Sequence, residues 1–248
     1  MTSVGKDMTL KVSAPLVAVG AAAVKASSSL EKGLSKVKAI SGATSSDMVM
    51  LKDKAIEMGA KTKFSASEAA DAFTYMAMAG WKTKDMMDGI DGIMNLSAAD
   101  GLDLATTSDI VTDAITAFGL SAKDSTHFAD VLAAASSNAN TNVSMLGESF
   151  KYVGPVAGAM GYSVEDVSTA LGLMANSGIK ASAAGTSLRT LLTNMAKPTD
   201  NMAAAMDALG ISLSDSSGKV KPLGQLMDEL RDHFSNGVVN VAEYIKKI

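Results

Sequence analysis

Cysteine is absent from this 248-residue sequence, and both histidine and aromatic residues are scarce. Without cysteine the chain can form no disulfide, no thiolate metal site and no cysteine nucleophile. The two histidines, His127 and His233, have no partners at metal-ligand spacing, so each is expected to be an ordinary polar position in a helix. Because aromatic residues make up only 4% of the chain, its core must be built from Ala, Leu, Val, Ile and the 17 methionines.

The chain also lacks a strong excess of one charge and a long apolar run. Its 22 basic and 26 acidic residues give a net charge of −4, which argues against a basic nucleic-acid-binding surface. The longest apolar run, residues 14–24, is about half of the ~20 residues that span a bilayer. A signal peptide is the weaker alternative, because Asp7 precedes the run and Pro15 opens it. An Ala-rich helix with proline in its first turn explains the run better.

No set of residues in the sequence predicts catalysis, a metal or a bound cofactor. Neighbouring carboxylates such as Glu165 and Asp166 are typical of helix starts, where the helix dipole favours them. Residues 178–185, GIKASAAG, lack the Gly-Lys-Ser/Thr ending of a phosphate-binding loop and follow no strand. An anion site at Lys180 and Ser182 stays open beside a structural role, because helix N-termini bind anions. We therefore expect that the protein is not an enzyme and has no cofactor.

Helix caps, apolar positions at helical spacing and closing glycines recur along the chain and predict an all-α protein. The expected form is a compact array of short helices and helical hairpins, with at most one small β-hairpin near residues 211–221. Three parts are expected: an N-terminal Ala-rich helical segment at 1–40, a core helical domain at 41–210, and a C-terminal hairpin with amphipathic helices at 211–248.

The segment at residues 150–189 carries the strongest helix-boundary signals. The sequence YVGP at 152–155 predicts a break, because proline removes a backbone donor and disfavours helix at the residue before it. Ser163 stands at an N-cap position, three residues before an acid. Gly178 is placed to end the following helix in a left-handed conformation, and another helix is expected to begin near Ser182.

Small side chains in the same segment predict close contact between helices. Gly185 is expected to lie where a neighbouring helix passes over it, and Arg189 to pair with an acid or cap a carbonyl. Trp81, the sole tryptophan, is predicted to be a packing anchor. The residues to which we assign a structural role in the segment are Tyr152, Gly154, Pro155, Gly178, Lys180, Gly185, Leu188 and Arg189.

Two stretches of the chain are similar to each other. Residues 64–80 align without a gap on residues 162–178, with an aromatic residue, a serine cap, an acid, an apolar stripe, a methionine and a terminal glycine at equivalent positions. A fainter copy begins at Ser121. The similarity indicates a repeated helical hairpin, or else convergence on common capping residues.

Several sequences in the chain resemble one family. The segments concerned are YVGPVAGAMG, GIKASAAGTSLR, LKDKAIEMGAKTKFSASEAADAFTYMAMAGW, LSAADGLDLATTSDIVTDAITAFGL and FADVLAAASSNANTNVSMLGESFKYVG. In content and order they resemble the core region of TP901-type phage tail tape measure proteins. The resemblance covers roughly residues 40–215. Members of this family usually have long helical segments on both sides of the core, so the chain is expected to be a truncated or prophage-derived form, or the core alone.

The resemblance implies a structural component of a phage or phage-like tail that lies within the tail tube and contributes to tail length control, assembly and genome delivery. It implies the tail tube protein, tail assembly chaperones and distal tail or baseplate hub proteins as partners, and a homo-oligomer in the tail. It implies no specific nucleic-acid binding, leaves room for transient membrane contact during ejection, and places the protein in the virion tail after assembly in the bacterial host cytoplasm. The alternative is a stand-alone helical interaction module or effector that shares this core.

Overall fold

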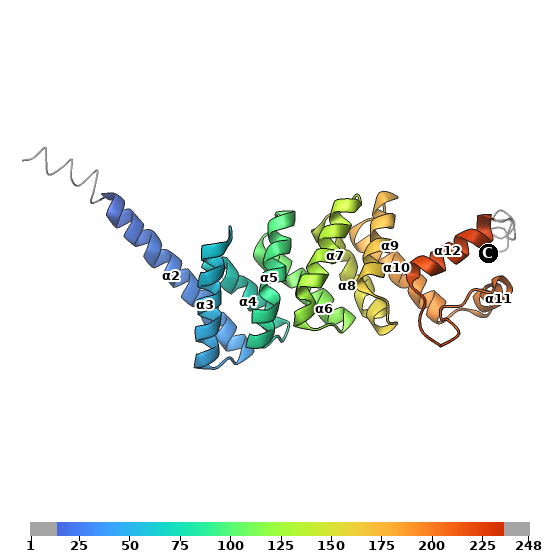
Figure 1. Ribbon diagram of the computed structural model, residues 1–248, viewed down its shortest axis with the longest axis horizontal. Helices are drawn as coiled ribbons and strands as arrows, with labels where there is room; N and C mark the ends of the chain where they lie inside the picture. Colours follow the sequence, from blue (N-terminus) through green and yellow to red (C-terminus); the bar gives the residue numbers. More distant parts are fainter. Residues whose placement is uncertain (1–13, 236–248) are drawn as a thin grey trace, which may run out of the picture.

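The computed structural model describes residues 14–235, which form an all-α chain, as the sequence predicts (Figure 1). In this part of the chain the sole β pairing is an isolated antiparallel bridge between Ser214 and Val220, inside the region expected to hold a hairpin. Asp7 and the predicted amphipathic tail after Ser235 lie outside the described residues. The α-helices are α2 (Ala14–Ser41), α3 (Ser45–Lys61), α4 (Ala66–Met78), α5 (Thr83–Asp100), α6 (Leu104–Phe118), α7 (Ser125–Asn138), α8 (Val143–Ala159), α9 (Val164–Asn176), α10 (Ala181–Ala196), α11 (Asp200–Leu209) and α12 (Leu223–Ser235), and η2 (Ala122–Asp124) is a 3₁₀ turn.

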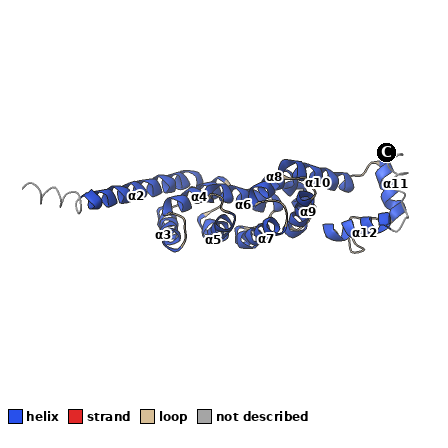
Figure 2. Cartoon of the chain, turned by 90° about the horizontal axis from the view of Figure 1, so that it is seen from above, coloured by secondary structure: helices blue, strands red, loops and turns tan. Residues whose placement is uncertain are grey.

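The helices from α2 to α10 alternate between two layers, which Figure 2 shows from above. One layer contains α2, α4, α6, α8 and α10, and the other contains α3, α5, α7 and α9, so that each helix packs against the next but one along the chain. The result is an elongated row, not a cluster around one centre (Figure 1). Such a row resembles the stacked helix pairs of α-solenoids, in which each unit buries its apolar face against its neighbours.

The core runs along the row between the layers and is continuous from Leu30 to Leu226. Three aromatic residues meet within the row, where the Phe150 ring contacts the rings of Phe118 and Phe128 edge to face at 5.6 and 5.7 Å between centroids. Trp81 is buried, as predicted for a packing anchor, and its ring fills the space above Gly89. Small residues therefore set the distance between helices, and the few large rings fill the space that remains.

The break predicted at residues 152–155 is wrong, because α8 continues through these residues. It runs from Val143 to Ala159 with Pro155 in its interior, although the carbonyl of Lys151 consequently loses its helical donor. The helix continues because it is packed between α6 and α10, and Val153 and Ala157 on either side of the proline are fully buried. Burial on this scale outweighs one lost hydrogen bond.

Gly161, six residues beyond the predicted break, is where the chain leaves this helix. Its φ of +81° is a conformation that favours glycine, and the Tyr162 N–H donates to the Ala157 carbonyl at 3.0 Å. This is the pattern that commonly ends an α-helix at a left-handed glycine.

The two similar stretches fold alike locally but occupy different places. Helices α4 and α9 both have 13 residues, and their N-caps, Ser65 and Ser163, each accept a hydrogen bond from the backbone three residues later. Phe64 and Tyr162 are both buried. However, α4 belongs to one layer and α9 to the other. The similarity thus marks one type of capped helix and does not extend to a repeated hairpin in an equivalent position.

Candidate functional site

Helices α8 and α10 approach each other closely where α10 crosses α8. A Cβ atom at Gly185 would meet the carbonyl oxygen, carbonyl carbon and Cα of Ser149, all closer than 3 Å. The prediction that a neighbouring helix passes over Gly185 is therefore confirmed. Leu188, one turn later, is buried in the same core. The absence of a side chain at Gly185 thus allows α10 to lie against the backbone of α8.

Ser149 was not singled out from the sequence, yet it connects these helices. Its hydroxyl is buried and lies 2.7 Å from the Ala181 carbonyl and 3.0 Å from the Met145 carbonyl, so it can donate to either oxygen. Ala181, the first residue of α10, has φ of +52°, and among the described residues it is the sole non-glycine in this region of backbone space. A left-handed alanine is disfavoured because its Cβ crowds the carbonyl, so the Ser149 contact helps to hold it.

The turn between α9 and α10 has the predicted glycine conformation. Gly178 has φ of +89°, and the Ile179 N–H donates to the Met174 carbonyl at 2.9 Å. Lys180 precedes α10 at the N-cap position without a side-chain cap. This turn directs the chain from one layer into the other.

The remaining residues of the predicted motif are divided between the interior and the surface. Gly154 is buried against α6, where a Cβ atom would lie 3.0 Å from that of Ala117. Tyr152, Pro155 and Arg189 are exposed. Among the described residues Arg189 makes no ion pair, so its expected pairing with an acid is not formed. The structure thus brings Gly185 and Leu188 to the α8–α10 contact and leaves the more polar members at the surface.

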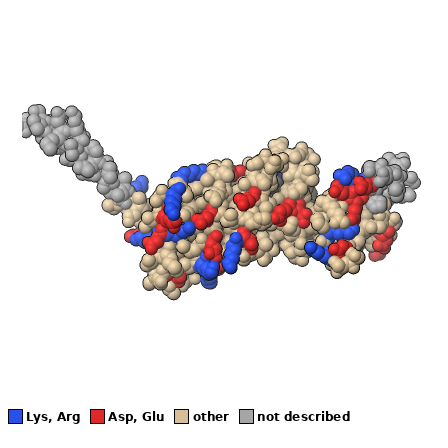
Figure 3. Space-filling view, in the orientation of Figure 1, with Lys and Arg blue, Asp and Glu red and all other residues tan. Residues whose placement is uncertain are grey.

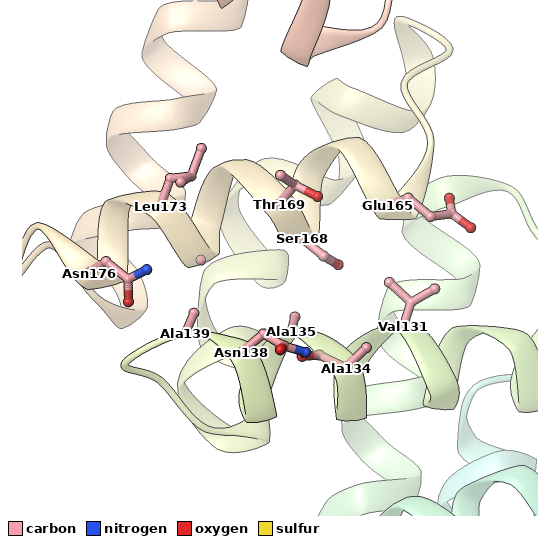
Figure 4. Close-up of a pocket in the computed structure, with 11 residues that line it drawn as sticks. Val131, Ala134, Ala135, Asn138, Ala139, Glu165, Ser168, Thr169, Leu173 and Asn176 are labelled. Atoms are coloured by element: carbon pink, nitrogen blue, oxygen red, sulfur yellow. The ribbon is translucent and has the colours of Figure 1, made fainter.

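A groove between α7 and α9 is the clearest concave surface of the row (Figure 4). Its volume is about 380 Å³. Most of the lining is made of short side chains, with Val131, Ala134 and Ala135 from α7, Ala139 directly after it, and Ser168, Thr169, Gly172 and Leu173 from α9. Because these side chains are short, the two helices leave a space between them that neither fills. The sequence did not reveal the groove, which exists only when α7 and α9 are neighbours.

Polar contacts join α7 to α9 at the two ends of this groove. At one end the imidazole of His127 contacts the carboxylate of Glu165, and at the other the Asn140 N–H donates to the Asn176 side chain at 2.7 Å. Burial tends to raise the pKa of Glu165, but hydrogen bonds from its own backbone and from His127 outweigh it and lower the pKa. His127, expected to be an ordinary polar position in a helix, is an exposed residue of α7 whose imidazole contacts α9.

Ser168 lies between these two contacts and has no hydrogen-bond partner. Its hydroxyl is buried, and Figure 4 shows it pointing from α9 toward α7. A buried hydroxyl without a partner is uncommon and costs free energy.

Within residues 14–235 no group of three or more His, Cys, Asp or Glu side chains is arranged to hold a metal ion. No helix in this range combines the length and apolar character needed to cross a membrane. Acidic side chains predominate over the middle of the row, whereas lysines are frequent toward α2 and α3 (Figure 3).

The profile of the phage-related minor tail protein family matches residues 52–244, which run from within α3 to beyond the start of α12. The chain belongs to this family. It is 40% identical to the tape measure protein of Pneumococcus phage Dp-1 over 231 residues, which are 93% of this chain and 20% of that protein. It is 27% identical to the probable tape measure protein of Escherichia phage P2 over 219 residues, 86% of this chain and 27% of that protein.

These relatives confirm the resemblance to tape measure proteins that the sequence motifs indicate. The chain spans about a quarter or less of the length of each of these two relatives. No solved structure matches the chain. The family membership and the two-layer row together describe a helical tail protein whose matched region is this row.

Proposed function

We propose that this chain is a structural component of a phage or phage-like tail, corresponding to the folded core of a tape measure protein. The observation that supports it best is the match of the minor tail protein family to residues 52–244, together with similarity to two tape measure proteins over most of the chain. The role is mechanical: the row supplies surfaces and stiffness, and its polar groups serve as caps and helix-to-helix contacts.

Within the tail, the proposed place of the chain is inside the tube, where it contributes to length control, assembly and genome delivery. A straight helix of 248 residues would extend only about 370 Å at 1.5 Å per residue. The described helices instead have 10 to 28 residues and fold back on one another in two layers. The proposed contribution of this region is therefore a folded body that contacts other tail proteins, and it does not measure length on its own.

The proposed partners are the tail tube protein, tail assembly chaperones and distal tail or baseplate hub proteins, with further copies of the same chain. Neither an enzymatic step nor a cofactor is part of the proposal. Assembly in the bacterial host cytoplasm precedes incorporation into the virion tail.

Purified particles provide the test. Mass spectrometry of intact virions should detect peptides from residues 14–235, and protease should cleave the chain only after the tails have been disassembled. Tail-less capsids from the same lysate are the matched control and should lack the peptides. A chain that is absent from tails would refute the proposal and favour the stand-alone interaction module. A chain that is cleaved in intact tails would refute its place inside the tube.

A further inference from the structure

Helix α3 forms one end of its layer and exposes an apolar stripe on the side away from the row. The exposed fractions of Val49 and Ile56 are 59% and 47%, and Ala60 is exposed on the same face. Asp53 lies between Val49 and Ile56 on this face and is also exposed. The spacings of four, three and four residues from 49 to 60 are those by which one helix seats on another. We call Val49, Asp53, Ile56 and Ala60 the α3 stripe.

The α7–α9 groove has the complementary shape. Its lining positions on α9, Glu165, Ser168, Gly172 and Asn176, follow the same spacing of three and four residues. The apolar surface within it is formed by short side chains, so an incoming helix can approach closely. A helix that carried medium-sized aliphatic residues would fill the space that alanine and glycine leave open.

The two surfaces also match in polarity. The Ser168 hydroxyl is buried without a partner near the middle of the groove, and Asp53 lies between the aliphatic residues of the stripe. The Asp53 carboxylate is a strong acceptor, and where the groove opens enough to uncover the buried Ser168 hydroxyl, the two groups can form a hydrogen bond at the centre of the contact. A polar pair inside an otherwise apolar helix contact also specifies its register.

Charge further distinguishes the two parts of the chain. Residues 1–63, which include α3, contain ten lysines and five acidic residues, whereas residues 64–196, which include the groove, contain six basic and fourteen acidic residues. Opposite net charges attract the two parts of different molecules and speed their encounter. Helix α3 itself carries three lysines and three acidic residues, so this attraction comes from the basic residues that precede it.

We propose that the α7–α9 groove of one molecule receives the α3 stripe of a second copy of the same chain. The contact is heterologous, because each copy offers a stripe at one place and a groove at another, so successive copies can join without closing into a dimer. This proposal rests on the proposed function in one respect, because a tail component is expected to be present in several copies. Its test is made on the isolated chain and does not depend on tails.

Two substitutions separate the two surfaces. Ile56→Glu places a charge on the stripe, and Ala134→Arg places a long charged side chain in the groove at an exposed position that folding should tolerate. Met78→Glu and Ser137→Arg are the matched controls, because they make the same charge changes at exposed positions outside both surfaces. Circular dichroism should show that all four variants retain their helices.

Sedimentation velocity over a range of protein concentrations then measures association. The unmodified chain and both controls should form a concentration-dependent series that extends beyond dimers and becomes weaker at high salt. Ile56→Glu and Ala134→Arg should each weaken association at least about tenfold when measured alone. Mixed together they should form a one-to-one dimer, because Ile56→Glu keeps an intact groove and Ala134→Arg keeps an intact stripe.

Three results would overturn the proposal. An unmodified chain that stays monomeric at the highest soluble concentration shows that the two surfaces do not bind each other. Variants that associate like the controls place the contact elsewhere. A mixture that remains monomeric while the unmodified chain associates indicates a symmetric contact and not a stripe in a groove. None of these results bears on whether the chain is found in purified tails, so the two proposals fail independently.

Discussion

The crossing of α10 over α8 at Gly185 can be tested by adding a single methyl group. In Gly185→Ala the new Cβ would overlap three backbone atoms of Ser149, which cannot rotate away as the end of a side chain can. The two helices must therefore move apart, and overpacking of this kind costs about 1–3 kcal/mol, with the upper value expected for a backbone contact. Alanine in place of glycine returns about 1 kcal/mol of helix propensity. The expected net loss is about 2 kcal/mol of unfolding free energy.

Thermal melts followed by circular dichroism measure this loss. For a chain of this size, about 2 kcal/mol corresponds to a decrease of about 4–8 °C in the melting temperature. Gly224→Ala in α12 is the matched control, because no atom lies within 4 Å of its new Cβ, and it should melt at or slightly above the unmodified protein. If Gly185→Ala melted no lower than Gly224→Ala, the close α8–α10 contact, and the role assigned to Gly185, would be wrong.

Three further substitutions test local features of the same chain. Gly178→Val should cost about 1–2 kcal/mol in the same melts, because φ of +89° is unfavourable for a β-branched residue, whereas no change would refute a structural role for this turn. Pro155→Ala should raise stability by about 1–3 kcal/mol, because it restores the N–H donor to the Lys151 carbonyl inside α8, and a loss would show that the helix needs the proline. Hydrogen bonds from Thr106 lower the pKa of Asp103, the N-cap of α6, so its contribution is complete above the unfolded pKa of about 4 and is lost as pH falls through the folded value. Asp103→Ala should therefore lower stability by about 0.5–2 kcal/mol at pH 7 and less at pH 2, and an equal loss at both values would contradict this account.

Helix ends marked by glycine and by short polar side chains could be predicted from the sequence. Ser163 caps α9 through the Asp166 N–H, and Gly178 has the left-handed conformation that its position suggests. These features depend on atoms within one or two turns of the chain, and the same local chemistry operates wherever the helix is placed. This also explains why residues 64–80 and 162–178 look alike although α4 and α9 occupy different layers.

Features that depend on a neighbouring helix could not be predicted in this way. The proline at 155 signals a break locally, but the burial of Val153 and Ala157 between α6 and α10 carries α8 through it. Ser149 looks like any serine in a helix until α10 places the Ala181 carbonyl 2.7 Å from its hydroxyl. In both cases the deciding partner is more than ten residues away along the chain.

The sequence by itself thus determined that the chain is helical, where most helices begin and end, and which tail protein family it resembles. Only the tertiary structure decided that the helices alternate between two layers, that α8 is continuous, and that α7 and α9 leave a groove with an unpartnered Ser168. The physical reason is the range of the interactions. Capping and backbone conformation act over a few residues, whereas layers and grooves arise from many small contacts between helices whose pairing no single segment encodes.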